Sequence, residues 1–409
     1  MPLSASRPVK RIAVLGAGIM GSATALFLAR RGHAVSLIDA AARPMSAASR
    51  WNEGKIHLGY LYSADPSLRT ARHVLTGSLQ FAPLTEELIG CPVAPATTAT
   101  DDVYLCHRAS VVAADAMAHY YRQVDDLVRS HADAARYLVD VRGARSERLD
   151  ERALRAITDS PDIAAGFQVP ERSVSTGWIA DRFVEALAAE PAIELQMGTG
   201  VTAVRPQQAD DPAGRWRVET ADGVAGVYDH VVNALWQGRL PIDVTAGLAA
   251  PQTWSNRYRL SLFVRTNRTV DAPIVLIATG PFGDIKNYNG RDFYLSWYPR
   301  GLMVDSSGIA PPPAPAQDAA REAAISREIL ERLTAILPCV ERIASDAESM
   351  VLRGGWVSAA GRGVLSDPRS TLHRRDEFGI VRLGSYVSVD TGKYASAPLL
   401  AHRIAQSLG

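Results

Sequence analysis

The feature that most constrains this chain is a glycine motif between two apolar segments near the N-terminus. Arg11–Leu15 is aliphatic and β-branched, which is typical of a strand buried on both faces. The GxGxxG motif of residues 16–21 follows, and apolar residues then recur with helical spacing up to Gly32. A second strand, Ala34–Ile38, ends at Asp39, 18 residues after Gly21. The sequence therefore predicts a strand–turn–helix–strand unit of a parallel sheet.

The residues of this unit predict a dinucleotide site. The first glycine permits a tight turn, the second lets the backbone approach a pyrophosphate, and the third lets the helix pack on the strand. Free N–H groups at the start of the helix attract phosphate, and an acid after the second strand accepts hydrogen bonds from ribose hydroxyls. The motif alone does not choose between NAD and FAD. The expected cofactor contacts are Gly16, Gly18, Ile19, Met20, Gly21 and Asp39.

Composition narrows the class of protein further. The 409 residues suffice for two or three folding units, and 44 basic against 43 acidic residues give a net charge of +1. We therefore expect no nucleic-acid partner and no polybasic membrane contact. Three isolated cysteines favour a reducing cytoplasm and give no metal site. The uncharged run Ile12–Ala29 imitates a signal peptide or membrane anchor, but three glycines interrupt it and a strand follows, so we favour a cytoplasmic core segment.

The segment after Asp39 favours FAD. Residues 46–57 are rich in Ser, Asn and Gly, which suit the wrapping of backbone and hydroxyl groups around an extended cofactor. Here the chain resembles the D-amino-acid oxidase, glycine oxidase and sarcosine oxidase family of FAD enzymes. The resemblance implies that this segment reaches the flavin. Its matching residues are Ser49, Arg50, Asn52, Gly54 and Lys55.

Further stretches extend the resemblance over most of the chain. A helix that follows Thr176-Gly177-Trp178-Ile179 leads to a strand at residues 201–204, and Val231–Trp236 is similar to a family strand that passes the cofactor. Leu352–Trp356 and Asp390–Tyr394 precede a final helix and match the part that meets the flavin ring. The implied cofactor contacts are Val201, Asn233, Ala234, Gly355, Thr391, Gly392 and Lys393. No cysteine follows Cys339, so we expect dissociable FAD, with attachment through His57 as a minor option.

The expected fold is α/β, with a Rossmann-like FAD-binding domain and a discontinuous α+β substrate domain built on an antiparallel sheet. The FAD-binding domain is expected at residues 1–85, 151–238 and 349–409, and the substrate domain at 86–150 and 239–348. In the latter, strands are expected at Tyr258–Arg265, Ile274–Ala278, Phe293–Tyr298 and Gly301–Asp305, and helices at Ala113–Arg129 and Ala319–Ile336.

The resemblance also implies site residues. Lys393, followed by Tyr394, is expected to bind a substrate carboxylate, unless it is an exposed loop lysine. Lys55 either assists oxygen reduction or forms an ion pair with Glu53, and His57 is either a base or a core histidine. Lys286, placed in a glycine-rich loop at 280–290, is a further candidate for oxygen activation. Tyr298 is expected to line the pocket, unless it belongs to the core.

Taken together, these features favour an FAD-dependent oxidoreductase. The expected reaction oxidises the C–N bond of an amino acid or small amine by hydride transfer to flavin N5. Oxygen is the expected oxidant, and an electron carrier such as a quinone is the alternative. A flavoenzyme acting on a 2-hydroxy acid or a specialised-metabolite intermediate, and a non-catalytic nucleotide-binding subunit, remain open. Neither the oligomeric state nor the substrate stereochemistry follows from the sequence.

Overall fold

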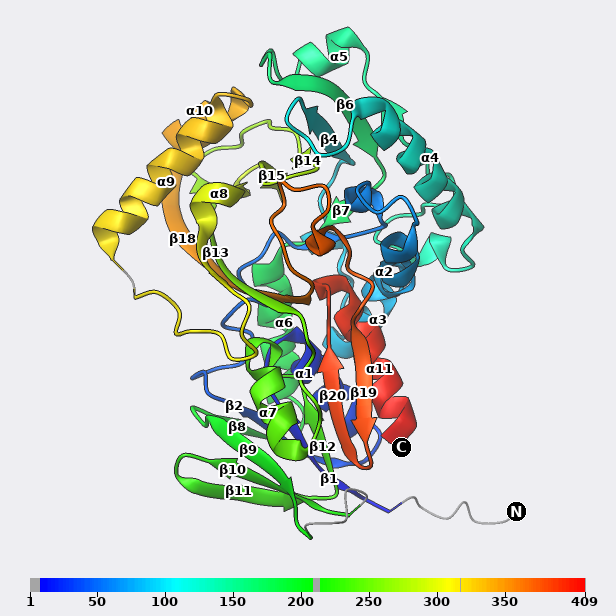
Figure 1. Cartoon of the computed structure of the whole chain (residues 1–409), viewed down its shortest axis with the longest axis vertical. Helices are drawn as coiled ribbons and strands as arrows, with labels where there is room; N and C mark the ends of the chain where they lie inside the picture. Colours follow the sequence, from blue (N-terminus) through cyan, green and yellow to red (C-terminus); the bar gives the residue numbers. More distant parts are fainter. Residues whose placement is uncertain (1–7, 209–213, 317, 409) are drawn as a thin grey trace.

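The structure is a computed structural model that describes residues 8–208, 214–316 and 318–408. Two large sheets organise these residues. Figure 1 shows the larger sheet with helices α9 (Ala319–Thr334) and α10 (Cys339–Ser345) at one end of the molecule and a small three-stranded sheet at the other. The α/β class expected from the sequence is confirmed, with one largely parallel sheet and one mixed sheet.

The first large sheet contains the predicted β–α–β unit. Its strand order is β19 (Gly379–Leu383), β20 (Tyr386–Asp390), β12 (His230–Asn233), β1 (Arg11–Leu15), β2 (Ala34–Asp39) and β8 (Ile193–Met197). All neighbours are parallel except β19 and β20. The N-terminal helix α1 (Ile19–Ala29) consists of small and aliphatic residues and is buried along its whole length. It therefore sits between the sheet and other helices rather than on the surface.

Different layers cover the two faces of this sheet. One face packs with α1, α2 (Arg69–Leu79), α3 (Phe81–Ile89), α6 (Thr176–Ala188) and α11 (Ala397–Leu408). The other packs with α7 (Arg239–Ala246) and a three-stranded sheet of β9 (Val201–Pro206), β10 (Trp216–Thr220) and β11 (Gly223–Tyr228). Strands β10 and β11 pair antiparallel as a hairpin. Both faces are buried, which explains the nearly continuous apolar character of β1.

The second large sheet carries the expected substrate side. Its strands are β17 (Leu302–Ser306), β13 (Trp254–Thr266), β16 (Asp292–Trp297), β15 (Gly283–Asn287), β14 (Val275–Ala278), β4 (Asp102–His107), β6 (Ile163–Val169) and β5 (Glu147–Arg148), with β18 (Ala347–Ala360) paired to β13. The β14–β4 pair is parallel, so the sheet is mixed rather than purely antiparallel. Helices α9 and α10 cover one face. The remaining elements are α4 (Ala114–Ser130), α5 (Glu151–Arg155), α8 (Tyr298–Gly301), β3 (Lys55–Ile56) and β7 (Arg172–Ser173).

Three details differ from the sequence-based expectations. Strands β6 and β18 pair within the second sheet, although the boundaries at 151 and 349 assign their residues to the FAD-binding domain. Lys286 lies in strand β15 and not in a loop, because the residues 283–287 pair antiparallel with β16, with Lys286 opposite Tyr294. Tyr298 begins the short helix α8, since Pro299 follows it and cannot donate a ladder hydrogen bond. We propose the division into two domains with β6 and β18 moved to the substrate domain.

Candidate active site

The turn between β1 and α1 has the geometry that a diphosphate requires. Gly16 has φ +96°, and a Cβ on Gly21 would lie 1.7 Å from the carbonyl oxygen of Gly16, so the helix approaches the strand closely only with glycine there. Gly18 is the N-cap of α1, and a Cβ on it would lie 2.9 Å from Ser49 Oγ. The first-turn N–H groups of a helix lack intrahelical partners and attract anions.

Two side chains hold this turn in place. Asp39, at the end of β2, accepts hydrogen bonds from the backbone N–H groups of Ala17 (2.6 Å) and Ala41 (2.7 Å). Ser49 Oγ accepts one from Ile19 N at 2.9 Å. Both residues line the cleft beside the glycine turn. The segment from 46 to 57 therefore reaches the cleft beside the glycine turn.

A long cleft runs from this turn to the C-terminal segment. It encloses about 1310 Å³ of space, part of which is open to solvent. Predicted residues that line it are Gly16, Gly18, Ile19, Met20, Asp39, Ser49, Asn52, Ala234, Gly355, Thr391, Gly392, Lys393 and Tyr394. One continuous cavity thus contains residues of the N-terminal glycine turn and of the C-terminal turn. The sequence assigns these two turns to opposite ends of one cofactor.

The far end of the cleft is a tight turn between β20 and α11. Gly392 has φ +61°, and its N–H donates to Asp390 Oδ1 at 2.9 Å. Opposite it, a Cβ on Gly355 would lie 2.7 Å from the Cβ of Ala48, so β18 and the 46–57 segment are in close contact there. Because Gly355 and Gly392 have no side chains, backbone groups at this end of the cleft have room to approach a flat ligand.

Lys393 is the predicted site residue with the most informative environment. It lines the cleft, its Nζ lies 3.5 Å from Nε2 of His57 and 5.5 Å from the ring centre of Tyr62, and within the described residues it forms no ion pair. Burial and the neighbouring Arg375 lower the pKa of Lys393 to about 8. A lysine in this setting is a cation at neutral pH that gains free energy when an anion binds beside it.

His57 is buried and contacts Lys393 rather than the cleft. Burial and the charge of Lys393 lower the pKa of His57 well below its usual value, so the imidazole is neutral. Its Nδ1 is buried and has no hydrogen-bond partner among the described residues. A neutral Nε2 accepts a hydrogen bond from the ammonium of Lys393, which gives His57 a positioning role.

The two other predicted lysines lie in a buried ion-pair network outside the cleft lining. Lys55 contacts Asp102 and Glu171, and Lys286 Nζ lies 2.9 Å from Asp102 Oδ2, with these ion-paired side chains fully buried. Burial alone would lower the pKa of Lys55, but the two carboxylates outweigh it and raise that pKa. The ion pair expected between Lys55 and Glu53 is replaced by these partners, which come from β4 and from the residue before β7.

The remaining predicted residues lie around the cleft without lining it. Asn233 donates to Asp243 and Tyr386, Arg50 pairs with Asp181, and Gly54 fits against the carbonyl of Val174. Gly21 packs beneath the glycine turn, Val201 belongs to the three-stranded sheet, and Tyr298 OH accepts a hydrogen bond from Arg257 Nη1 at 2.7 Å. These side chains support the cleft rather than form its wall.

Sequence reasoning missed several residues that line the cleft. Arg259 and Ser261 extend from β13, and Arg375 from the segment before β19. Arg257 precedes the predicted strand at 258–265, and Arg259 and Ser261 lie within it. Residues two positions apart on a strand share a face, so a row of polar side chains on one face was the signal that could have identified them. Arg375 lies in an irregular segment, where no periodicity marks it.

The fold and the cleft define a dinucleotide-binding oxidoreductase with a separate substrate sheet. The family model for FAD dependent oxidoreductases matches residues 11–371, and the chain belongs to this family. FAD is therefore its cofactor. The residues present fit this group, because a Cβ on Gly18 would enter the space beside the α1 N-terminus where the diphosphate has to lie.

Solved structures share the whole fold. The glycine oxidase from Geobacillus kaustophilus is similar with a TM-score of 0.68 and 16% identity over 97% of this chain and 94% of that one. The iminodiacetate oxidase from Chelativorans sp. BNC1 has a TM-score of 0.66 and 16% identity over 97% and 95%. At these identities the likeness establishes the fold alone.

A curated relative is the bifunctional protein MnmC of tRNA 5-methylaminomethyl-2-thiouridine biosynthesis from Chromohalobacter salexigens. It is 27% identical over 230 residues, which make up 56% of this chain but only 28% of the relative. The match therefore covers a part of that larger protein. Separately, none of the helices in the described part of the chain is both long and apolar enough to cross a membrane.

Proposed function

We propose that this chain oxidises the C–N bond of an amino acid or small amine, with oxygen as the oxidant. When bound, FAD supplies the acceptor for the hydride that leaves the carbon next to nitrogen. The observation that carries the proposal is Lys393, a half-buried cation without an ion pair in the described residues, in the turn that ends the FAD cleft. In this proposal its ammonium binds a substrate carboxylate through charge-assisted hydrogen bonds.

The surrounding charges favour the reactive form of an amine substrate. Hydride loss requires a neutral amine, and nearby positive charges lower the pKa of a bound ammonium group. Lys393 and Arg375 line the same cleft and supply such charges. The protein thus orients the substrate through its carboxylate and promotes release of the amine proton to solvent before oxidation.

The second sheet provides the cover over the reacting end of the cleft. Arg259, Ser261 and Tyr294 come from adjacent strands β13 and β16 and line the cleft. Ser261 Oγ donates to Tyr294 OH at 2.9 Å, so the two side chains hold each other. A rigid sheet above the cleft limits water and fixes the substrate carbon relative to FAD.

The test is anaerobic reduction of the FAD-loaded protein by a panel of D- and L-amino acids, N-methyl amino acids, simple amines and 2-hydroxy acids. Loss of flavin absorbance near ~450 nm with an amino acid or amine supports the proposal. Reduction by 2-hydroxy acids only would assign the alternative substrate class. Retention of FAD without reduction by any member would favour a non-catalytic subunit. Admission of oxygen then shows whether it reoxidises the flavin at a catalytic rate.

Two further expectations stay with this proposal. We propose that FAD is bound non-covalently, because Cys91, Cys106 and Cys339 do not line the cleft. His57 does not line it either and contacts Lys393 instead. Denaturation should release all the flavin into the supernatant. We also propose a cytoplasmic location, which fractionation of the producing cells tests.

A further inference from the structure

Four cationic side chains gather at the flavin end of the cleft. Arg259, Arg375 and Lys393 line the cleft, and Arg257 lies two residues before Arg259 on the same face of β13. Arg257 and Arg259 also share Tyr298: Arg257 Nη1 donates to its hydroxyl at 2.7 Å, and the guanidinium of Arg259 lies 4.3 Å from its ring centre. The proposed carboxylate site at Lys393 accounts for one of the four charges.

The donors of these arginines are poorly matched within the protein. Arg257 is 3% exposed, and its Nε and Nη2 are buried without a hydrogen-bond partner, as is Nε of Arg259. Across the residues that the structure describes, the guanidinium of Arg375 makes no hydrogen bond or ion pair. Burial and repulsion by Arg257 lower the pKa of Arg375 to about 10. Buried charged donors of this kind cost free energy unless an acceptor reaches them.

Nearby carboxylates do not neutralise the cluster directly. Glu53 lines the cleft and Asp284 is on β15, and both influence the cations through space. Neither forms an ion pair with the cluster within the described residues. Asp390 also acts on Arg375, but its carboxylate pairs with Arg239. A ligand that enters the cleft can supply acceptors for these guanidinium donors.

We propose that the substrate carries a second anionic group, a carboxylate or a phosphate, which Arg257, Arg259 and Arg375 bind while Lys393 binds the first carboxylate. This inference rests on the proposed function and narrows its substrate class to dianionic amino acids. Planar guanidinium groups bind such anions through paired hydrogen bonds, and one carboxylate at Lys393 offers too few oxygens for three further cations.

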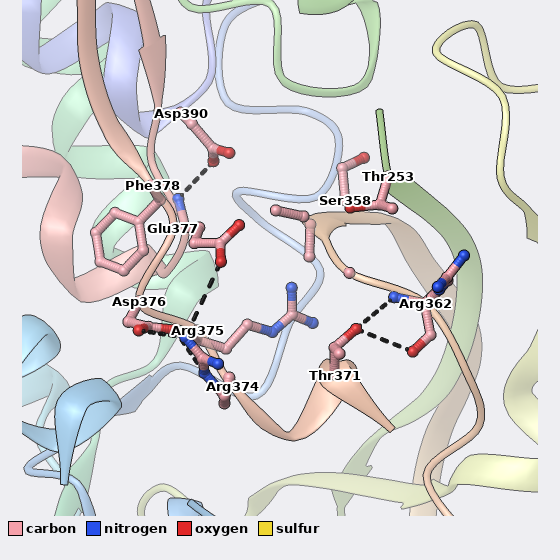
Figure 2. Close-up of a pocket in the computed structure, with 14 residues that line it drawn as sticks. Thr253, Ser358, Arg362, Thr371, Arg374, Arg375, Asp376, Glu377, Phe378 and Asp390 are labelled. Carbon is pink, nitrogen blue, oxygen red and sulfur yellow. Dashed lines mark hydrogen bonds and ion pairs between the residues drawn. The ribbon is translucent and has the colours of Figure 1, made fainter. Parts of the chain in front are cut away.

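A side pocket gives the second group room. It encloses about 730 Å³, part of which is open to solvent, and it shares Arg375 and Gly392 with the cleft. Figure 2 shows the guanidinium of Arg375 extending toward the middle of this pocket, between Ser358 and the Arg374–Asp376 pair. A substrate substituent that passes Gly392 would meet Arg375 first.

The first experiment compares matched substrates with the wild-type FAD-loaded protein under anaerobic conditions. Aspartate and glutamate are paired with asparagine and glutamine, and O-phosphoserine with serine, each as D- and L-forms. We expect the dianionic member of at least one pair to reduce the flavin at least about tenfold more efficiently, which is about 1.4 kcal/mol. The carboxylate and phosphate pairs show which second group is recognised. Equal efficiency within every pair overturns the inference but leaves the proposed function intact, whereas no reduction by any amino acid or amine defeats both.

The second experiment measures binding without turnover. Succinate and propionate are titrated against the change in flavin absorbance, and succinate is expected to bind at least about tenfold more tightly. Arg257→Gln should weaken succinate binding at least about tenfold and change propionate binding less than about threefold. Arg375→Gln gives the same test if the buried Arg257 variant fails to fold. Arg265→Gln, on the same strand but exposed and paired with Asp292, is the matched control and should change neither constant. Equal affinity of the wild type for both acids would overturn the inference.

Discussion

The ammonium nitrogen of Lys393 lies 3.5 Å from Nε2 of His57, and this neutral ring is its nearest polar partner among the described residues. A buried lysine would ordinarily pair with a carboxylate. Lys55 and Lys286 do so through Asp102, whereas Lys393 faces the FAD cleft instead. Lysine is thus part of a buried ion-pair network at two of these positions and lines the cleft at the third.

Lys393→Met should weaken the binding of substrate carboxylates. Loss of a charge-assisted hydrogen bond costs ~1.5–3 kcal/mol, so kcat/KM for an amino acid should fall roughly 10- to 150-fold. Steady-state oxygen consumption measures this fall. Lys10→Met is the control, because Lys10 bonds to the carbonyl of Leu408 away from the cleft. Lys393→Arg should recover part of the loss. Unchanged kcat/KM in Lys393→Met would remove Lys393 from the substrate site.

Carboxylate binding should weaken as the pH rises above about 8. Burial and Arg375 lower the pKa of Lys393 from 10.5 to about 8, so Lys393 is charged below that pH and neutral above it. The dissociation constant of propionate should therefore be constant from pH 6 to 7 and rise nearly tenfold per unit above pH 8. Titration of the flavin absorbance at each pH gives this constant. The rise should be absent in Lys393→Met; a rise that persists there would assign it to another group.

Gly18→Val should abolish retention of FAD. A Cβ at this position lies 2.9 Å from Ser49 Oγ, and the branched side chain would fill the space next to the N-terminus of α1. We expect at least about tenfold less FAD per protein after gel filtration. Gly143→Val is the control, because a Cβ there meets nothing within 4 Å. Normal FAD content in Gly18→Val would contradict the assigned diphosphate position.

Asp102→Asn should destabilise the fold. The change leaves the buried ammonium groups of Lys55 and Lys286 without their shared carboxylate, and breaking such a pair costs ~3–5 kcal/mol. Its neighbour Asp101 pairs with Arg172 at 2.8 Å with 29% of its side chain exposed, so Asp101→Asn should cost less than ~1 kcal/mol. Circular dichroism melting at saturating FAD compares the two. Equal melting temperatures would show that the buried network carries little stability.

The β1–α1–β2 unit was predictable because its signals are local. Glycine spacing, the strand patterns and the position of Asp39 all lie within residues 11–39. The positive φ of Gly16 and the close approach of Gly21 to the Gly16 carbonyl also lie within this unit. The C-terminal turn at 391–393 followed from the family resemblance. In the structure this turn lines the same cleft as the N-terminal glycine turn.

The charge partners were not predictable in the same way. Asp102 and Glu171 approach Lys55 because strands distant in sequence pair, and nothing near residue 55 indicates this. Arg257 and Arg259 alternate on one face of a strand, but only the tertiary fold shows that this face lines the cleft. Long-range packing therefore decides which lysines and arginines remain free for a ligand.

The central claim is that an amino acid held at Lys393 reduces the FAD in this cleft. The direct measurement is an anaerobic titration of the FAD-loaded protein with the most active amino acid from the panel, followed by assay of the products. The account predicts that the flavin bleaches completely and that one 2-oxo acid and one ammonia, or amine, form per flavin. A protein that stays yellow with every amino acid and amine, or that does not retain FAD, would contradict it.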